Sequence, residues 1–479
     1  MEPDQQLALG ATDAVAAIAA GEVTATAYTT TLLDRAEQLT DRRAVITLNR
    51  AGALAAAARI DEARRSGTAL GRLAGLPVIV KDNINTKNLP TTAGTPALQD
   101  FRPTEDAPVL RPLLDAGAII LGKANMHELA FGITTTNFSP FAGIATNPYD
   151  PARIPGGSSG GTGAAIAARI APAGLGSDTG ASVRIPAAFN GIAGLRPSTG
   201  GRVHRYSGAG VCPLSHTLDT VGPMARTVAD VALLDSVITG APVLPPSRLD
   251  GLRVGVPATL WSGLEGEVDT VMQAAKRRLA DAGVVFVDVD MPDVLALSEK
   301  AIFPIALHEP IADIAGYLAE SGATGITVES IVDQIASPDV KRTFEVVLAD
   351  AMAPAYPDAV DVHRPQLQRM YGAYFADNAL DVLLFPTSPV LPAPIDPVNG
   401  SGTLSVDGGP PVDTFITTIR NMGPGSTAGV PSLSLPAGLS AGGLPVGLNL
   451  EGPIDSDSTV LAIGMAIESV LGPLPAPQL

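Results

Sequence analysis

The sequence has little of several residue types on which common functions depend. Its 479 residues include one cysteine, Cys212, which excludes an internal disulfide and a cysteine-cluster metal site. The five histidines are scattered, and HELAF (127–131) lacks the second histidine of the H-E-x-x-H motif, so we expect neither a metal nor a cofactor. No run reaches 18 consecutive apolar residues, and we therefore expect no transmembrane helix and no membrane partner.

Positive charge is scarce as well. Lysine and arginine total 31 against 48 aspartates and glutamates, which gives a formal net charge of −17 and argues against a nucleic-acid partner. The first residues, MEPDQQ, lack the basic-then-apolar pattern of a secretory signal, so a cytoplasmic location is expected. The hydrophobic fraction of 46% is enough for a large core.

Short apolar segments alternate with helical patterns over most of the chain, and this alternation predicts an α/β fold. The expected strands lie at 44–48, 76–80, 118–122, 252–257, 283–292 and 380–386, and two more pair near the C-terminus. Helices are expected within 11–40, at 51–65, 107–116 and 265–282, and through most of 294–375. No repeat or clean linker divides the chain, so we expect one domain over 1–479, with 240–375 as its most separate and mainly helical part.

Three segments carry candidate chemistry, and the first is VIVKDN, which places Lys81 at the end of an apolar strand. Most lysines at such positions extend their amine to water. Burial in apolar surroundings instead disfavours the ammonium form, and a lysine so placed can act as a base near pH 7. The chain has only six lysines, which makes this one more notable.

The second segment, IPGGSSGGTG (154–163), formally matches the G-x-S-x-G nucleophile elbow at Ser158 and Ser159. No hydrophobic strand precedes it, and the last hundred or so residues lack the histidine that an α/β-hydrolase needs after its serine. It also lacks the lysine of a phosphate loop. Without other evidence, this segment is a glycine-rich turn into a helix at 160–170.

The third segment, GLGSDTGASVRIPA (174–187), offers consecutive backbone N–H groups before a short helix that follows Ser182. Such donors suit an oxyanion, although an ordinary turn with an N-cap has the same composition.

Taken together, KDNI, NPYDPARIPGGSSGGTGAA, GLGSDTGASVRIPAAFNGIAGLRPS and SHTLDTVGPMARTVAD resemble the amidase signature family. The resemblance is dense over 71–235 and thinner in LLFPTSP and in the C-terminal strand pair. It implies one α/β/α sandwich with a large mixed central sheet. The helical stretch 294–375, within the variable region 240–375, would then form the wall of the substrate pocket.

The resemblance also implies a Ser–Ser–Lys triad that cleaves amides. Ser182 occupies the nucleophile position, Ser158 the bridging position after a cis peptide bond, and Lys81 the base position. The reaction would pass through an acyl-enzyme, because a serine hydroxyl becomes an effective nucleophile when a base removes its proton.

Further site residues follow from the same resemblance. The backbone N–H groups of the loop would hold the oxyanion, and Ala181 departs from the glycine common in the family at that position. The expected oxyanion-hole residues are Thr179, Gly180, Ala181 and Ser182, and the supporting residues are Ser159, Asp178 and Arg184. The expected substrate-binding residues are Ala130, Phe131, Met126, Leu129, Ile133 and Gly157.

The apolar character of NMHELAFGI predicts a hydrophobic or aromatic small-molecule amide as substrate. AGTPAL, HELAFG and DTGAS resemble the indoleacetamide and mandelamide hydrolase branches most, and urethanases of the family also look similar, so a carbamate substrate stays open. A homodimer would be common among such relatives.

Two other functions stay open. GRVHRYSGAG (201–210) resembles a stretch of the glutaminase component of glutamyl-tRNA amidotransferases, their A subunit, which releases ammonia from glutamine, whereas 354–375 does not resemble the tyrosine-rich helix of that component. A non-catalytic binding protein on the same scaffold is the other alternative, and the intact Lys81, Ser158 and Ser182 argue against it.

Overall fold

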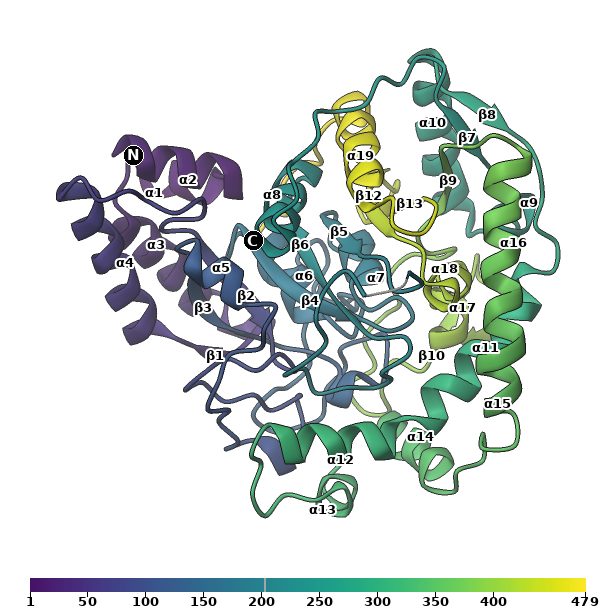
Figure 1. Ribbon diagram of the computed structural model, residues 1–479, viewed down its shortest axis with the longest axis horizontal. Coiled ribbons are helices and arrows are strands. Elements are labelled where there is room, and N and C mark those ends of the chain that lie inside the picture. The colour runs from purple at the N-terminus through teal and green to yellow at the C-terminus, as the bar shows by residue number, and fades with distance from the viewer. Residues whose placement is uncertain (202–203) are drawn as a thin grey trace.

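A mixed sheet of eleven strands organises the chain in the computed structural model, which describes residues 1–201 and 204–479 (Figure 1). Of the segment GRVHRYSGAG, Arg202 and Val203 therefore lie outside the described residues. The strand order is β1-β3-β2-β4-β6-β5-β12-β13-β9-β7-β8. The strands are β1 (Val45–Leu48), β2 (Pro77–Lys81), β3 (Ile119–Ala124), β4 (Ala173–Asp178), β5 (Ala193–Arg196), β6 (Thr220–Ala225), β7 (Arg253–Gly255), β8 (Val285–Val287), β9 (Val382–Pro386), β12 (Ser432–Leu439) and β13 (Pro445–Glu451), and β10 (Thr403–Ser405) pairs separately with β11 (Pro411–Asp413).

Parallel and antiparallel pairs alternate in blocks across this sheet. Strand β2 runs parallel to both β3 and β4, and β7 runs parallel to both β8 and β9. The central and C-terminal pairs, among them β4 with β6 and β12 with β13, are antiparallel. The expected large mixed sheet and the expected C-terminal strand pair are thereby confirmed.

Helices cover both faces of the sheet. Successive residues of a strand point to opposite faces. In β12, Ser432 accepts a hydrogen bond of 3.1 Å from Arg184 on one face, while the next residue, Leu433, packs closely against Gly464 of a helix on the other face. The sheet is therefore the middle layer of an α/β/α sandwich.

The helices have the following bounds. They are α1 (Pro3–Ala8), α2 (Ala11–Ala20), α3 (Ala25–Gln38), α4 (Arg50–Arg65), α5 (Arg111–Asp115), α6 (Gly160–Ala167), α7 (Arg184–Phe189), α8 (Val228–Thr239), α9 (Ala258–Trp261), α10 (Gly266–Asp281), α11 (Val294–His308), α12 (Pro310–Glu320), α13 (Val328–Asp333), α14 (Pro338–Leu348), α15 (Tyr356–Asp358), α16 (Arg364–Asp377), α17 (Thr414–Ile419), α18 (Gly423–Ala428) and α19 (Asp457–Leu471). Short turns of helix also occur as η1 (Thr40–Arg42), η2 (Pro96–Leu98), η3 (Glu128–Ala130) and η4 (Ala359–His363).

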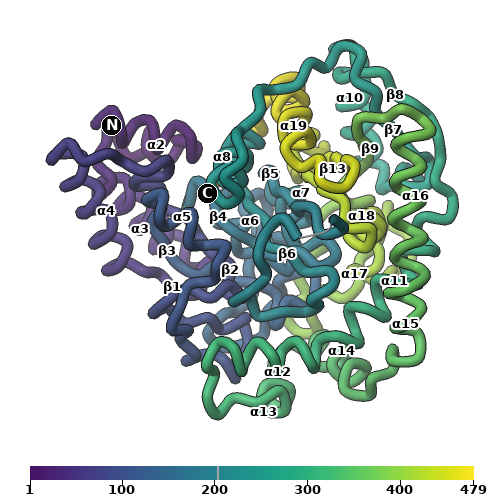
Figure 2. Tube along the Cα trace, viewed as in Figure 1, coloured from purple at the N-terminus to yellow at the C-terminus, as the bar shows by residue number. Residues whose placement is uncertain are grey.

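The N-terminal helices α1 to α4 lie at one end of the longest axis, and β7 to β9 with α10 and α16 lie at the other (Figure 1). Helices α12 to α14 run along one edge of the molecule (Figure 2). Within 240–375, β7 and β8 extend the central sheet, and α10 connects them. The mainly helical part of this region is therefore limited to α11 to α16. No helix in the described ranges is long and apolar enough to cross a membrane.

The prediction missed the strands at the centre of the sheet. β4 and β5 lie in a glycine-rich part of the chain where no strand was expected, no strand was expected at β6 either, and no helix was expected where α17 and α18 lie. Glycines in these central strands allow neighbouring backbones to approach closely. A Cβ added to Gly174 would lie 2.5 Å from the carbonyl oxygen of Ile79, and one added to Gly222 would lie 2.2 Å from that of Leu195. β4 and β5 lack the β-branched side chains by which strands are usually predicted, and in β6 glycine and proline follow the β-branched Thr220 and Val221.

Gly222 supplies a test of this close packing. Replacing Gly222 with alanine places a methyl group against the backbone of β5, and we expect destabilisation of about 1–3 kcal/mol or more. The control is Gly372→Ala on the exposed face of α16, where an added Cβ meets nothing within 4 Å and alanine favours the helix. Thermal unfolding should show a lower midpoint for Gly222→Ala only. Equal midpoints for the two variants would contradict this account of the central strands.

Candidate active site

Lys81 ends β2 with its side chain fully buried. Its amine donates to the hydroxyl of Ser158 at 2.7 Å and to that of Ser177 at 2.8 Å, and it lies 3.3 Å from the carbonyl oxygen of Ser177. Burial lowers the pKa of Lys81 to about 7, although Asp178 and Asp219 oppose this effect. A large fraction of these amines is therefore neutral near pH 7 and able to accept a proton.

Ser158 follows a cis peptide bond from Gly157, as the resemblance implies. Its neighbour Ser159 directly precedes α6 and forms hydrogen bonds to the segments that contain Ser177 and Ser182. The Ser159 N–H donates to the carbonyl oxygen of Ser182 at 3.1 Å, and its hydroxyl donates to the carbonyl oxygen of Ser177 at 3.1 Å. Ser159 thus ties Ser158 to both neighbouring segments, and its side chain contacts Ser177, which accepts from Lys81.

The loop from Thr179 to Ser182 connects β4 to the turn before α7 and lines a pocket. The backbone N–H groups of Gly180, Ala181 and Ser182 donate no hydrogen bond to any residue within 1–201 or 204–479, so they are available to a ligand. Ala181 has a negative φ and keeps its N–H, so the departure from glycine removes no donor. The Thr179 hydroxyl donates to Asp219 at 2.6 Å, which fixes the start of the loop.

The hydroxyl of Ser182 borders the pocket and, within the described part of the chain, makes no side-chain hydrogen bond. The structure therefore brings Lys81 and Ser158 into direct contact and places Ser182 next to them through the Ser159 backbone bond.

Buried charges hold the loop in place. The carboxylate of Asp178 accepts two bonds of 3.0 Å from Arg184 and one of 3.0 Å from the N–H of Val183. Arg196 also contacts it at 3.2 Å. Burial alone would raise the pKa of Asp178, but Arg184 and Arg196 outweigh burial and hold the pKa at about 2. Asp178 is therefore an anion that fixes both ends of the loop.

The pocket beside Ser182 has a volume of about 450 Å³ and a mainly apolar wall. Three of the expected substrate residues, Ala130, Phe131 and Ile133, line it. The wall also takes residues from α11, from α14 and from the segment around α17, and among the aromatic side chains of 294–375 it includes Phe303. That the helices of 294–375 form the wall of the substrate pocket stays a prediction, and the contribution of 401–419 to this pocket was not foreseen.

The other expected substrate residues lie outside this wall. Met126 and Leu129 are buried, and Leu129 packs in a hydrophobic cluster with Leu98 and Phe131. Gly157 lies against the backbone of Ile133, where an added Cβ would come within 2.7 Å. None of these three residues therefore belongs to the pocket lining.

Sequence reasoning missed Ser177, which contacts the Lys81 amine, and Asn83, which contacts Ser177. The Ser177 hydroxyl accepts from Lys81 and also from the Asn83 amide at 3.0 Å, and that amide further donates to the carbonyl oxygen of Cys212 at 3.2 Å. Asn83 stands two positions after Lys81, and Ser177 directly precedes Asp178. Once β4 is recognised as a strand beside β2, its end has to lie near Lys81, and that pairing was the missing signal.

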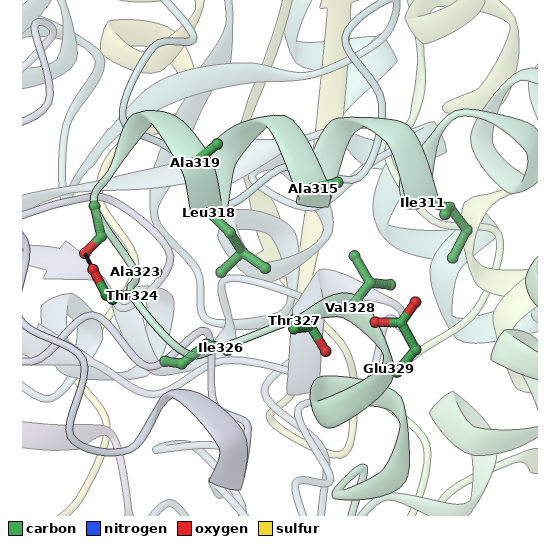
Figure 3. Close-up of a pocket in the computed structure, with 11 residues that line it drawn as sticks. Ile311, Ala315, Leu318, Ala319, Ala323, Thr324, Ile326, Thr327, Val328 and Glu329 are labelled. Carbon is green, nitrogen blue, oxygen red and sulfur yellow. Dashed lines mark hydrogen bonds between the residues drawn. The ribbon is translucent and has the colours of Figure 1, made fainter.

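Two other features compete with this site. A hollow along α12 and residues 322–329 is lined by Ile311, Leu318 and Val328 and contains no lysine or histidine among its lining residues (Figure 3). His216, Glu309 and Asp313 offer ligand atoms within 4.8 Å of one another, as a metal site would. Glu309, however, already accepts hydrogen bonds from the hydroxyls of Ser215, Thr217 and Tyr356, so this cluster is accounted for without a metal.

Comparison with known proteins agrees with this geometry. A sequence model of the Amidase family matches residues 27–461. Mandelamide hydrolase of Pseudomonas putida is 38% identical over 491 residues, covering 99% of this chain and 94% of that protein. Indoleacetamide hydrolase of Rhizobium radiobacter is 40% identical over 446 residues, covering 92% of each.

The chain is also similar to a solved structure and to a subunit of an amidotransferase. The crystal structure of native peptide amidase from Stenotrophomonas maltophilia superposes with a TM-score of 0.80 at 30% identity, covering 98% of each chain. The A subunit of the glutamyl-tRNA(Gln) amidotransferase of Chloroflexus aurantiacus is 38% identical over 487 residues, covering 96% of each.

The ion pairs of Asp178 can be tested by substitution. Asp178→Ala leaves two buried guanidinium groups without their shared anion, and we expect a loss of about 3–5 kcal/mol of stability. The control is Asp34→Ala, which removes the half-exposed pair with Arg50 at 2.9 Å and should cost less than about 1 kcal/mol. Thermal unfolding of both variants checks the difference. Similar midpoints would mean that the buried pair does not hold the loop.

Proposed function

The chain belongs to the amidase family and is a hydrolase of C–N bonds in amides, and from this premise we propose that it cleaves small hydrophobic or aromatic amides through an acyl-enzyme on Ser182. The observation that carries the proposal is the buried Lys81 amine, 2.7 Å from the Ser158 hydroxyl and near a loop, ending at Ser182, whose N–H groups at Gly180, Ala181 and Ser182 bond to no residue of the described ranges.

In the first half of the reaction, neutral Lys81 takes the proton of Ser158 while Ser158 takes that of Ser182. The Ser182 hydroxyl turns toward Ser158 for this relay and attacks the carbonyl carbon of the amide. The negative charge that forms on the carbonyl oxygen is stabilised by the N–H groups of Gly180, Ala181 and Ser182.

The second half completes the proton balance. The C–N bond breaks as the relayed proton returns from Lys81 through Ser158 to the leaving amine. Water then attacks the acyl-enzyme, gives its proton to the same relay and releases the acid, and Ser182 regains its proton. No other base is needed, because one amine accepts and returns the proton in both halves.

The apolar wall supports a hydrophobic or aromatic acyl group. Phe131, Ile133 and Phe303 offer large nonpolar surfaces next to Ser182. The relatives named for mandelamide and indoleacetamide support an aryl acyl group as well. A carbamate presents the same carbonyl to the same serine, so we include urethane cleavage in the proposal. A cytoplasmic location and a homodimer stay predictions.

Glutamine hydrolysis within an amidotransferase is the second candidate function. The similarity to the A subunit of such an enzyme favours it. The mainly apolar wall favours an aryl group, but Asp339, Arg342 and Asp413 also line the pocket and supply charges for the α-ammonium and α-carboxylate of glutamine, so the substrate panel separates the two functions. A non-catalytic binding role would leave the contact between Lys81 and Ser158 without a purpose.

Hydrolysis of a matched panel tests the proposed function. The panel comprises an aryl-acetamide, an anilide, an aryl carbamate, a fatty amide and free glutamine. We expect turnover of the aryl compounds and a loss of at least about 10³-fold in Ser182→Ala, because the nucleophile is removed. Activity that survives in Ser182→Ala would contradict the assignment, and turnover of glutamine alone would favour the amidotransferase function.

The pH dependence tests the base. Lys81 is active when neutral, so kcat/KM on an aryl amide should rise with pH and level off above about 7, following the pKa of Lys81. In Ser177→Ala the ammonium loses an acceptor, which lowers the pKa further and should move the rise to lower pH. A rise that stays in place, or moves to higher pH, would contradict the role of Ser177 beside the base.

A further inference from the structure

The dipeptide His127–Glu128 lies buried between the catalytic serines and the helical wall. Both side chains have no exposed surface, and the mechanism above uses neither of them. The backbone N–H of His127 donates to the carbonyl oxygen of Ser158 at 3.0 Å. The backbone of this dipeptide therefore contacts Ser158, and its two side chains are free to contact a different part of the fold.

Glu128 binds the start of α14. Its carboxylate accepts from the backbone N–H of Ser337 at 2.7 Å, from that of Ala336 at 3.1 Å and from the hydroxyl of Thr95 at 2.8 Å. Ser337 is the N-cap of α14, where N–H groups lack helical partners and the helix dipole favours an anion. The carboxylate thus caps α14 from a separate segment of the chain.

His127 contacts the same end of this helix. Its Nδ1 lies 3.2 Å from the backbone N–H of Thr135, which donates to it, so the proton of a neutral ring lies on Nε2. Nε2 lies 3.0 Å from the carboxylate of Asp339, in the first turn of α14. Gly132 makes room for the ring, because a Cβ there would lie 2.2 Å from Nε2.

The anchored helix presents one face to the substrate pocket. Asp339, Arg342, Thr343 and Val346 line the pocket, and their i, i+3, i+4, i+7 spacing places them on one side of α14. On a neighbouring face, Phe344 packs against Phe131 with ring centroids 4.8 Å apart. The position of α14 therefore sets how much space an acyl group has.

We propose that His127 and Glu128 are positioning residues that fix α14 against Ser158 and so determine which acyl groups the pocket accepts. This inference rests on the proposed amide hydrolysis at the same site. A large acyl group contacts more of the pocket wall than an acetyl group does, so displacement of α14 penalises large acyl groups and largely spares small ones.

The test compares phenylacetamide with acetamide in wild type and in Glu128→Gln. The glutamine keeps the shape but turns at most one acceptor oxygen toward the N–H groups of Ala336 and Ser337, which directly precede α14. We expect the ratio of kcat/KM for phenylacetamide to kcat/KM for acetamide to fall about tenfold. The fall should come from a higher KM for phenylacetamide. A factor of about ten corresponds to the cost of leaving one buried hydrogen-bonding group unsatisfied. Glu345→Gln, an exposed position on the same helix, is the matched control and should leave the ratio unchanged.

Hydrogen exchange and a second variant complete the design. Amide exchange at 336–337 should become faster in Glu128→Gln and stay at the wild-type rate in Glu345→Gln. The second variant is His127→Gln, which removes the ring that contacts Asp339 and leaves every pocket-lining residue unchanged; it should lower the same ratio and serves if Glu128→Gln does not fold.

Three outcomes would overturn the proposal. The first is a ratio of kcat/KM values within about twofold of the wild-type ratio, and the second is unchanged amide exchange at 336–337. The third is an equal loss of kcat/KM on both amides, which a merely structural role would produce. If the wild-type protein hydrolyses neither amide, the proposed function fails. Amide exchange at 336–337 still tests the contact between Glu128 and the start of α14 separately, and unchanged exchange in Glu128→Gln would contradict that contact's role.

Discussion

The hydrogen bond between the buried amine of Lys81 and the hydroxyl of Ser158 is the contact on which the rest of the site depends. An amine that stayed charged could accept no proton, and burial is what brings its pKa to about 7. The sheet supplies that burial, because β2 delivers Lys81 beside β4 and β4 brings Ser177 and the 179–182 loop to the same edge. Stable anions nearby, Asp178 above all, limit how far the pKa falls.

Most outer parts of the fold were predictable from the sequence because their signals are local. The strands at 44–48 and 76–80 are apolar runs, and Thr24 caps α3 by accepting from the N–H of Ala27, as its position before the helix indicates. The centre of the sheet was not predictable in this way. β4 reads AGLGSD, a composition typical of turns, and only its contact with Ile79 and Ser159 explains why larger residues are excluded.

The candidate site shows the same division. Lys81, Ser158 and Ser182 were identified by resemblance, since no local pattern in any one segment distinguishes a catalytic serine from a capping one. The structure adds what depends on tertiary contact: Ser177 at the amine, Asn83 bonded to Ser177, the pocket wall from 401–419, and the burial of Met126 and Leu129 in the core. Each of these follows from how distant segments meet, and the apolar composition of NMHELAFGI could not separate wall residues from core residues.

Trapping of the covalent intermediate tests the central claim most directly. The enzyme would be mixed with an activated aryl-acetyl ester, quenched in acid within the first turnover, digested and mapped by mass spectrometry. The account predicts one aryl-acetyl group on Ser182, and none in Lys81→Ala, where the relay has no base. An acyl group on Ser158 or Ser177, or turnover with no acyl group on any serine, would contradict it.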